Sequence, residues 1–523
     1  MEVAQEVSVS FETDLPEELR VPSDTILVPG NLSRRGLSEI VNQLLELDPP
    51  RPFDFLVDEE FLRVTLARFL QKSNRTAETV LRVKYVLALG KPVSQDLDVQ
   101  DDWISDLSLP SANQGHGVIV SSCYDGFIRF LNPVLQSEEE TEGPAGPCEV
   151  VGQFQPSSRD LCAVQALDVW TLDDAAEVFE VVAAMSSGEV VVSAVSAPSA
   201  SSDTKEEERQ KAPPEMVIRR AFHGRAHGDS AEAVGVSPDL SILASGAADG
   251  SLLLWSNPLQ DGVGSLPPLS DTGGTEAAES SRGKKRGASE LGATQSLPSH
   301  ASPLAPRASI QHDCHSLGVS SLLWAKGGCQ LASASLDQTV RVWDAITASL
   351  VVALPCSRPA LYLAAPLSHD VLCTSHDDGS IRIWDLRRGG MGADAGETGE
   401  VKGFPRKSLG SSGPIAGLQP SSRSILQSQL PAHRRAAPQV HFNPQKDEQL
   451  ASVSHDGTLK IFDIRAKGLP LQSVAVGGEE EEGASAGREA PKVLCCRWTE
   501  DGSGIVTGDS EGKVRIHRLD SGG

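Results

Sequence analysis

Alternating apolar and polar positions recur along most of the chain, each time after a turn that contains an acidic residue. One copy reads SHDDGSIRIWD over residues 375–385, where the turn is followed by the alternation Ile-Arg-Ile-Trp. Asp-Gly pairs favour tight hairpin turns, and apolar residues at every second position indicate a strand with one buried face. The pattern therefore predicts a series of β-hairpins built on one repeated plan.

Five clear copies of this plan share one spacing, in which an Asp stands six residues before a large closing residue. The Asp residues are Asp125, Asp249, Asp337, Asp378 and Asp456. The closing residues are Leu131, Trp255, Trp343, Trp384 and Phe462. Two weaker copies cover residues 185–193, which lack both Asp and Trp, and residues 508–517.

The period of the repeat indicates the fold. Asp337 and Asp378 lie 41 residues apart, within the period of about 40–45 residues that is typical of WD40 blades. The repeated phrase resembles the WD-repeat signature, and seven copies predict an all-β seven-bladed WD40 propeller over residues 102–523. Longer spacings coincide with stretches rich in Gly, Ser, Pro and charge, which predict disordered inserts near residues 257–307 and 388–428.

The seventh copy predicts an incomplete blade. Its strand pattern ends near His517, so the last blade lacks an outer strand. A closed ring avoids an exposed sheet edge. We therefore expect the linker at residues 89–101 to give the closing strand, with the pairing segment inside residues 86–99.

Residues 1–88 follow a different pattern. Strand alternation covers residues 7–11, 25–28, 53–57, 61–62 and 80–86, whereas residues 37–45 and 66–70 have helical spacing. This order predicts an α+β domain in which one helix packs across a sheet, as in a ubiquitin-like fold.

Composition narrows the function. The net charge of -25 argues against general binding of nucleic acid, which requires clustered Lys and Arg. The nine Cys are odd in number and contain no C-x-x-C, which indicates reduced thiols. The acidic N-terminus does not read as a signal peptide, and no apolar run is long enough to span a bilayer, so we expect a soluble intracellular protein.

Two Ser/His/Asp sets could suggest a hydrolase. They are His227, Ser245 and Asp249 with Trp255, and His315, Ser333 and Asp337 with Trp343. An enzyme needs one such set, whereas these recur once per blade, at the spacing of the structural tetrad of WD repeats. Buried polar groups are tolerated when they are paired, so we expect hydrogen-bonded structural tetrads and no enzyme activity.

The sixth copy keeps the polar residues His433, Ser452 and Asp456 but closes on Phe462, which cannot donate a hydrogen bond. We therefore expect a weaker network there.

A basic cluster in the long insert contains Lys284, Lys285 and Arg286. Such a cluster suits nuclear import or a local RNA contact, and a solvated linker is the plain alternative.

Three segments of the first domain resemble the NLE-type ubiquitin-like domain: GLSEIVNQLL (36–45), PFDFLVDEEFLRVTLARFL (52–70) and AETVLRVKY (77–85). That domain precedes WD repeats in two families of ribosome-assembly factors, Notchless and WD repeat-containing protein twelve. The segment DDWISDLSL (101–109) and the seven copies resemble the second family, because the Notchless type typically has eight blades.

The resemblance implies a non-enzymatic assembly factor of the large (60S) ribosomal subunit precursor, required for pre-rRNA processing in the nucleolus and nucleoplasm. Its propeller would bind the block-of-proliferation protein and its partner Pescadillo, with no membrane contact and at most a local rRNA contact. A Notchless-like factor, or a generic WD40 adaptor such as a ubiquitin-ligase substrate receptor, remains the alternative.

The resemblance also implies a site in the first domain. The AAA ATPase midasin would bind this domain through its MIDAS domain and release the factor from the particle. Glu78 would donate a carboxylate to the Mg²⁺ of the MIDAS domain, while the chain would have no cofactor of its own. Asp58, Glu59 and Glu60 are rival acids, and a solvated loop position is the plain alternative for Glu78.

Overall fold

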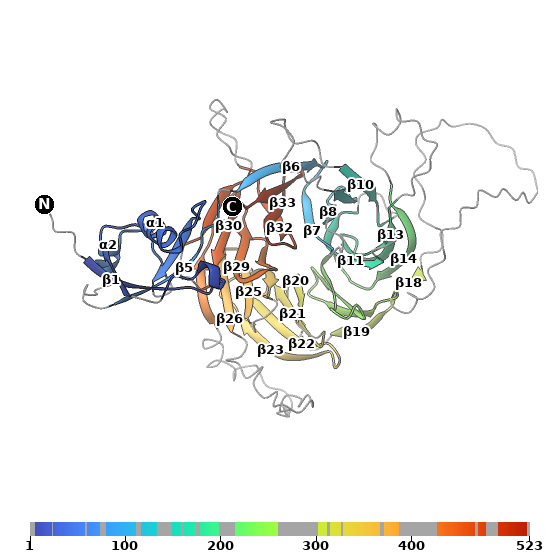
Figure 1. Ribbon diagram of the computed structural model, residues 1–523. Coiled ribbons are helices and arrows are strands. Elements are labelled where there is room, and N and C mark those ends of the chain that lie inside the picture. Colours follow the sequence, from blue (N-terminus) through green and yellow to red (C-terminus); the bar gives the residue numbers. More distant parts are fainter. Residues whose placement is uncertain are drawn as a thin grey trace, which may run out of the picture.

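The computed structural model contains two regions of different architecture, a small mixed domain and a ring of sheets (Figure 1). The structure describes residues 6–22, 25–57, 60–73, 80–90, 92–110, 117–132, 149–157, 162–173, 178–197, 215–259, 302–310, 314–325, 328–366, 371–385, 426–465, 469–476 and 490–519. Among the described helices, none has the length and apolar content needed to cross a membrane.

The N-terminal domain is built on one five-stranded sheet with the strand order β2-β1-β5-β3-β4. Its strands are β1 (Glu6–Glu12), β2 (Thr25–Pro29), β3 (Phe53–Val57), β4 (Glu60–Phe61) and β5 (Leu81–Leu87). The helices are η1 (Glu17–Leu19), α1 (Arg34–Leu45) and α2 (Leu66–Lys72). The central strands β1 and β5 are parallel, whereas the other pairs are antiparallel.

The apolar pattern of this domain determines its core. Val7, Val9 and Phe11 alternate along β1 and are buried, while Leu37 and Val41, four residues apart, form the buried face of α1. These residues pack into one hydrophobic cluster with the aromatic residues of β3 and β5. The strands and helices expected from the sequence differ from the observed ones by a few residues at their ends.

The other strands of the described residues form seven sheets around a ring. The first sheet contains β7 (Ile104–Ser108), β8 (Ile119–Cys123), β9 (Ile128–Asn132) and β10 (Glu149–Phe154). The second contains β11 (Val164–Asp173), β12 (Val178–Met185), β13 (Glu189–Ser196), β14 (Val217–Arg225) and β18 (Ser302–Pro303). The third contains β15 (Ala231–Val236), β16 (Ile242–Ala247), β17 (Leu252–Ser256) and β19 (Pro306–Ile310).

The remaining sheets have the same four-stranded plan. The fourth contains β20 (Val319–Trp324), β21 (Gln330–Ser335), β22 (Thr339–Asp344) and β23 (Ser349–Pro355). The fifth contains β24 (Ala360–Ala364), β25 (Val371–His376), β26 (Ser380–Asp385) and β27 (Leu426–Pro431). The sixth contains β28 (Val440–Asn443), β29 (Lys446–Val453), β30 (Thr458–Asp463) and β31 (Gln472–Ala475). The seventh contains β32 (Val493–Trp498), β33 (Gly504–Asp509), β34 (Lys513–Arg518) and β6 (Val93–Val99).

The outer strand of the seventh sheet comes from the segment that precedes the first sheet. β6 pairs antiparallel with β34 from Lys513↔Val99 to Arg518↔Val93, inside the segment 86–99 where the sequence predicts a closing strand. Two polar contacts accompany the ladder: Asp96 pairs with Arg515 at 2.6 Å, and the hydroxyl of Ser94 lies 2.7 Å from Nδ1 of His517. The two ends of the ring are thus joined by one continuous sheet.

Apolar residues from neighbouring sheets pack together around the ring. Cys495 and Cys496, adjacent on β32, illustrate this arrangement because they lie in two different hydrophobic clusters. One cluster includes residues of the sixth sheet and the other includes residues of the first. Successive side chains of a strand therefore pack against the sheets on its two opposite sides, as expected from its period of two.

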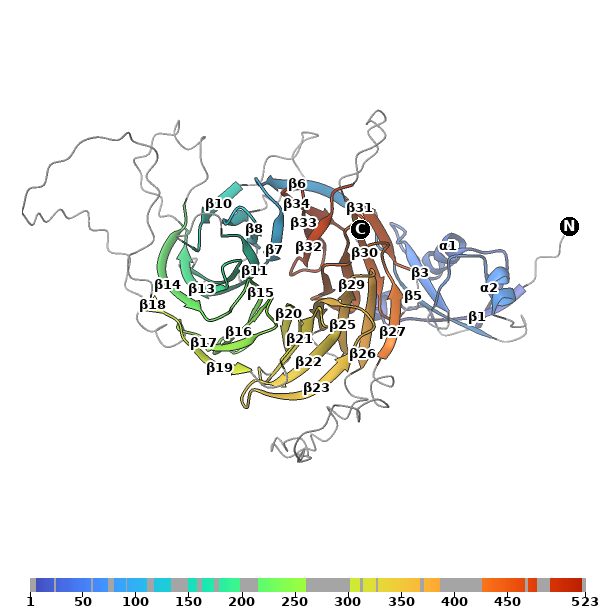
Figure 2. The same ribbon diagram turned by 180° about the vertical axis from the view of Figure 1, so that it is seen from behind.

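The N-terminal domain lies beside the outer edge of the sixth sheet (Figure 2). Gln472 of β31 donates a hydrogen bond to the carbonyl oxygen of Gly90 at 2.9 Å, and Leu89 packs against the apolar cluster of this region. Arg465 lies 3.5 Å from the carboxylate of Asp14, which also pairs with Lys84 of β5. These contacts connect the domain and the short segment after β5 to the ring.

Candidate functional site

Several of the predicted site residues fall outside the described part of the chain. They are Glu78, its rivals Asp58 and Glu59, and the basic residues Lys284, Lys285 and Arg286. The rival Glu60 is described and lies 3.5 Å from Nζ of Lys72 in an exposed ion pair.

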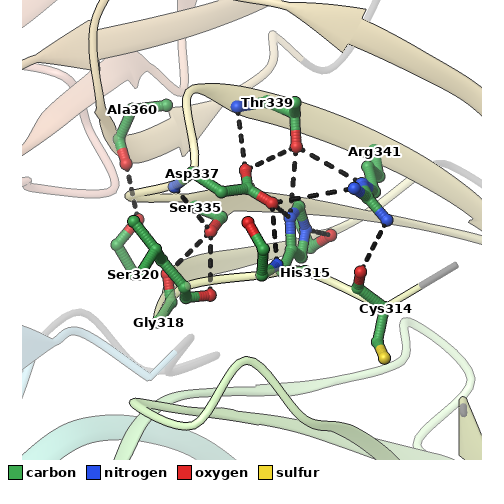
Figure 3. Close-up of polar contacts among 12 residues, drawn as sticks. Cys314, His315, Gly318, Ser320, Ser335, Asp337, Thr339, Arg341 and Ala360 are labelled. Carbon is green, nitrogen blue, oxygen red and sulfur yellow. Dashed lines mark hydrogen bonds and ion pairs between the residues drawn. The ribbon is translucent and has the colours of Figure 1, made fainter.

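The fourth sheet contains the complete hydrogen-bonded set expected from its sequence. The indole N–H of Trp343 donates to the hydroxyl of Ser333 at 2.8 Å, and Ser333 lies 2.8 Å from Nε2 of His315. Nδ1 of His315 lies 2.9 Å from the carboxylate of Asp337 (Figure 3). Because a carboxylate only accepts, Nδ1 bears the proton and Nε2 accepts from Ser333. The donors therefore run in one direction, from Trp343 to Asp337.

The electrostatics of this network match a structural role. Burial lowers the pKa of His315, which is therefore neutral at pH 7. Burial alone would raise the pKa of Asp337, but hydrogen bonds from Thr339 and His315 outweigh it and hold that pKa below its usual value. Since every polar atom of His315 and Ser333 is occupied and the ring nitrogens are buried, the set offers neither a free nucleophile nor a free base.

The third sheet has a variant of the same set. Trp255 donates to Ser245 at 2.8 Å, and Ser245 lies 2.6 Å from Nε2 of His227. Nδ1 of His227 lies 2.6 Å from the hydroxyl of Ser251, so a serine occupies the position that Asp337 fills in the fourth sheet. Asp249 instead accepts the backbone N–H of Gly228 at 2.9 Å and closes the turn. The predicted direct contact between His227 and Asp249 is thus replaced by a serine contact.

The sixth sheet lacks the donor at the end of the network, as its sequence predicts. His433 lies 2.7 Å from Ser452 and 3.0 Å from Thr458, while the hydroxyl of Thr458 donates to Asp456 at 2.5 Å. Phe462 is buried and offers no hydrogen to Ser452. The series of hydrogen-bond donors therefore begins at Ser452, whereas in the fourth sheet it begins at the indole N–H of Trp343.

Other sheets contain equivalent networks that the repeated phrase does not reveal. In the fifth sheet, Trp384 donates to Thr374 at 3.0 Å, and Thr374 lies 2.8 Å from Nε2 of His376. In the seventh, His517 takes the position of the tryptophan and lies 2.9 Å from Thr507. In both sheets a threonine stands where the other sheets have a serine. Because threonine supplies the same hydroxyl group, it is the sequence feature that could have predicted these networks.

In the first sheet, Gln100 replaces the histidine. Its side-chain N–H₂ group donates to Ser121 at 2.6 Å, and its side-chain oxygen accepts from Arg129 at 2.9 Å. Arg129 also pairs with Asp125 at 2.6 Å. The glutamine belongs to the segment just after β6, so the closing strand and the first sheet share one network.

A central cavity of about 880 Å³ is lined by residues of the innermost strand of each sheet. Polar side chains connect different sheets around it. Asp106 accepts from the side chain of Gln439 at 2.9 Å and from the backbone N–H of Leu167 at 3.2 Å. Asp168 accepts from the backbone N–H of Val236 at 2.9 Å, and Arg497 donates through Nε to the carbonyl oxygen of Leu107 at 2.8 Å. These contacts hold the sheets in register around the cavity.

One buried carboxyl lies between the second and third sheets. Glu180 of β12 is fully buried and accepts from the side chain of Asn257 at 2.7 Å, while its second oxygen has no hydrogen-bond partner among the described residues. Burial raises the pKa of Glu180 to about 7. The described residues contain no group of three or more side chains placed to hold a metal ion.

Profiles of two known families match segments of the N-terminal domain and of the ring. The profile of the NLE (NUC135) domain matches residues 7–70, and that of the WD domain, G-beta repeat, matches residues 220–256, 307–344 and 485–518. These matches cover the first four strands and the helices of the five-stranded domain, up to residue 70, and parts of the ring.

Several known proteins are similar to this chain over almost its full length. The ribosome biogenesis protein WDR12 homolog of Chlamydomonas reinhardtii is 29% identical over 532 residues, which cover 98% of each chain. The ribosome biogenesis protein YTM1 of Kluyveromyces lactis is 26% identical over 98% of this chain and 96% of its own. The ytm1 protein of Emericella nidulans is 27% identical over 97% and 94%.

Proposed function

We propose that this chain, an NLE-domain and WD40-repeat homologue of the ribosome biogenesis proteins WDR12 and Ytm1, is a non-enzymatic assembly factor of the large ribosomal subunit precursor. The observation that carries the proposal is the match to these proteins over 98% of the chain, which includes both regions. Their names support a role in ribosome biogenesis, and such a role implies work in the nucleus and nucleolus.

The fold proposed for this function is a ubiquitin-like domain followed by a seven-bladed propeller. The parallel central pair β1 and β5, with α1 packed on the sheet, supports the first part. The seven sheets of the described residues, closed by β6, support the second. We place the domain at residues 1–88, the linker at 89–101 and the propeller at 102–523.

A scaffold role agrees with the polar groups of the ring. Each Ser/His set that is described is saturated by hydrogen bonds inside its own sheet, so these sets offer no free nucleophile. We propose that the propeller binds the block-of-proliferation protein and, through it, Pescadillo, and supports processing of pre-rRNA. A generic WD40 adaptor is the alternative, and the NLE domain speaks against it.

Affinity purification of the tagged full chain tests this proposal. Recovery of the block-of-proliferation protein, Pescadillo and large-subunit precursor proteins is the expected result. Recovery of a cullin-type ubiquitin ligase without ribosomal precursors would overturn it and favour the adaptor. Substitution of Lys284, Lys285 and Arg286 by Ala should reduce nucleolar accumulation, and unchanged accumulation would remove the import role from this cluster.

We further propose that Glu78 completes the coordination of Mg²⁺ in the MIDAS domain of midasin. Mg²⁺ is usually held by one or two carboxylates together with other oxygen ligands, so one carboxylate from a partner can fill an open position. Two described acids of this domain are already engaged: Asp54 is buried and lies 2.8 Å from Arg34, and Glu60 pairs with Lys72.

Binding of the isolated MIDAS domain to full-length variants tests the metal contact. Glu78→Ala should abolish binding that depends on Mg²⁺, and Glu78→Asp should weaken it, because the shorter side chain withdraws the carboxylate. Glu60→Ala is the matched control and should bind as the parent does. Undiminished binding by Glu78→Ala, or equal loss in the control, would contradict the assignment.

A further inference from the structure

The N-terminal domain and the ring meet without a free residue between them. The backbone N–H of Ala88 donates to the carbonyl oxygen of Pro52 at 2.9 Å, so the buried Ala88 still belongs to the domain. The next residue, Leu89, packs against the apolar cluster of the sixth and seventh sheets. The carbonyl oxygen of Gly90 accepts from the side chain of Gln472 on β31 at 2.9 Å. Residues 88–90, which we call the joint, therefore attach the domain to the ring at one fixed point.

A second contact between the two regions lies away from the joint. One terminal nitrogen of Arg465, just after β30, lies 3.5 Å from a carboxylate oxygen of Asp14, in the segment after β1. The same carboxylate pairs with Lys84 of β5. Lys84 precedes Ala88 by four residues, which span about 13 Å of extended chain at about 3.3 Å per residue. Two contacts this far apart fix the angle between the domain and the sixth sheet, whereas the joint alone leaves the domain free to turn.

Asp14 is held firmly on its own domain. The hydroxyl of the preceding residue, Thr13, donates to the carbonyl oxygen of Tyr85 on β5 at 2.8 Å. The same hydroxyl accepts the backbone N–H of the following residue, Leu15, at 3.2 Å. The position of Asp14 therefore follows that of β5, and its contact with Arg465 reports the angle of the whole domain.

Separation of Asp14 from Arg465 leaves neither charge without a partner. Arg465 keeps Asp463, whose carboxylate accepts from Nε at 3.0 Å and lies 2.7 Å from a terminal nitrogen. It also keeps Glu448, which lies 3.6 Å away, while Asp14 keeps Lys84. A broken buried pair is costly because it leaves an uncompensated charge. That cost is absent here, so this contact opens and closes easily.

The two contacts respond differently to salt. The side chain of Asp14 is 67% exposed and that of Arg465 is 30% exposed. Ion pairs this accessible are weak, and the screening length falls from about 10 Å at 0.1 M salt to about 3 Å at 1 M. The joint consists of uncharged hydrogen bonds and apolar packing, which screening does not weaken. Salt therefore removes the second contact and leaves the joint.

We propose that Asp14 and Arg465 form a latch that holds the N-terminal domain at one angle to the ring, and that opening the latch lets the domain turn about the joint. Raised ionic strength opens the latch by screening, and a partner that presents a basic side chain to Asp14 opens it by competition. The domain thus has a docked and a turned state, and a ligand that favours one of them shifts the population. This device goes beyond the proposed function, because it does not depend on which partner binds the domain.

Distances between the domain and the ring, measured by pulsed electron spin resonance on the full chain, test the latch. Spin labels on non-natural amino acids replace Leu27 of β2 and Ile346 after β22, which are 64% and 68% exposed. Thiol labels are unsuitable, because the chain has nine Cys. The distance distribution should be narrow at about 50 mM NaCl and about twice as wide or more at about 1 M NaCl, where the ion pair is screened.

Variants assign the effect to the latch. Asp14→Lys repels Arg465, so its distribution should be about twice as wide as that of the parent already at about 50 mM NaCl, and Asp14→Asn should change it in the same direction. Glu12→Lys is the matched control, because it makes the same charge change in a residue that pairs with Arg82 of its own domain, and it should stay narrow. Melting curves verify that each variant is folded.

A change at the joint tests the other half of the proposal. Insertion of Gly-Gly-Ser-Gly between Ala88 and Leu89 separates the two bodies and should give a wide distribution at both salt concentrations. A narrow distribution in this variant or in Asp14→Lys would overturn the proposal. So would an equal widening in Glu12→Lys, or a parent distribution that does not change with salt.

Discussion

The N-terminal domain and the ring bury polar groups in different ways. The domain has one hydrophobic cluster, and, apart from Tyr85, Asp54 is the only polar residue that is buried among its described residues. Its Tyr85 hydroxyl donates to the carbonyl oxygen of Leu19 at 2.7 Å and accepts from the N–H of Val21 at 2.8 Å. In the ring, by contrast, most sheets bury a histidine or glutamine with a hydroxyl partner.

This difference shows where polar residues can be taken as evidence of function. In the ring, a Ser/His/Asp set is repeated and saturated, so its presence says little about chemistry. In the small domain, surface acids are numerous, and Glu12, Glu39 and Glu60 each pair with a basic residue, so an exposed acid does not by itself mark a site. The exceptions in the described part of the ring are a few buried polar atoms without a hydrogen-bond partner, such as the second carboxyl oxygen of Glu180 and Nε2 of His223.

The largest expected effect on stability comes from truncating the chain before or after the closing strand β6. A chain of residues 92–523 retains β6 and should unfold cooperatively, as should residues 1–88 alone. A chain of residues 102–523 leaves the edge of β34 unpaired and should aggregate or lose its cooperative transition, since exposed strand edges recruit other chains. Thermal melting and light scattering measure this effect. Equal melting of the two longer chains would show that β6 is dispensable.

Acid should affect the ring and spare the domain. Burial lowers the pKa of His376, His433 and His517 to about 4, from 6.5, whereas residues 1–88 contain no histidine. The unfolded chain binds these protons first, so stability is present above pH 6.5 and is lost as pH falls toward 4. Each histidine contributes about 3 kcal/mol at most.

Urea unfolding of residues 92–523 and of residues 1–88, measured between pH 7 and pH 4, tests this difference. An equal loss of stability in both would contradict it.

Glu180 should give the opposite dependence of stability on pH within the ring. Its pKa is raised to about 7, from 4.5, so the folded state prefers the protonated form. Its contribution is present below pH 4.5 and is lost as pH rises to 7. Glu180→Gln keeps the acceptor for Asn257 and should stabilise the ring by up to about 3 kcal/mol near pH 8, with little change near pH 4. A gain that does not vary with pH would rule out the carboxyl as its cause.

The smallest expected effect is a difference in the free energy of unfolding between matched variants in two sheets of the ring. Ser333→Ala removes contacts to both Trp343 and His315, whereas Ser452→Ala removes only the contact to His433, because Phe462 donates nothing. The first change should therefore cost about 1 kcal/mol more than the second. Urea unfolding of the two variants at pH 7 measures the difference. Equal costs would show that the indole donor contributes nothing.

The sequence predicts the order of the elements well, because the periods of 2 and 3.6 are local. The position of β6 is also predictable, since an incomplete sheet requires a strand from elsewhere. The polar networks are predicted where His, Ser, Asp and Trp stand at the repeat spacing, as in the fourth sheet.

The sequence does not predict the partners of individual atoms. Ser251 in place of Asp249 beside His227, and Gln100 in place of a histidine, depend on side-chain directions that only the folded chain reveals. The lining of the central cavity is equally hidden, because residues such as Tyr362, His441 and Arg497 come from three different sheets. Glu78 lies outside the described residues, so its role stays a prediction.

The pairing of β6 with β34 also has a consequence for synthesis. Ser94 and His517 meet across 423 residues of chain. A ribosome that adds about 5–20 residues per second delivers β34 roughly 20–85 seconds after β6. During that interval β6 has one ladder partner missing, and every sheet between them can form before the ring closes. Pairing of β6 therefore has to wait until β34, the last strand of the ring, has been made, and a nascent chain halted before residue 513 would leave β6 without its ladder partner.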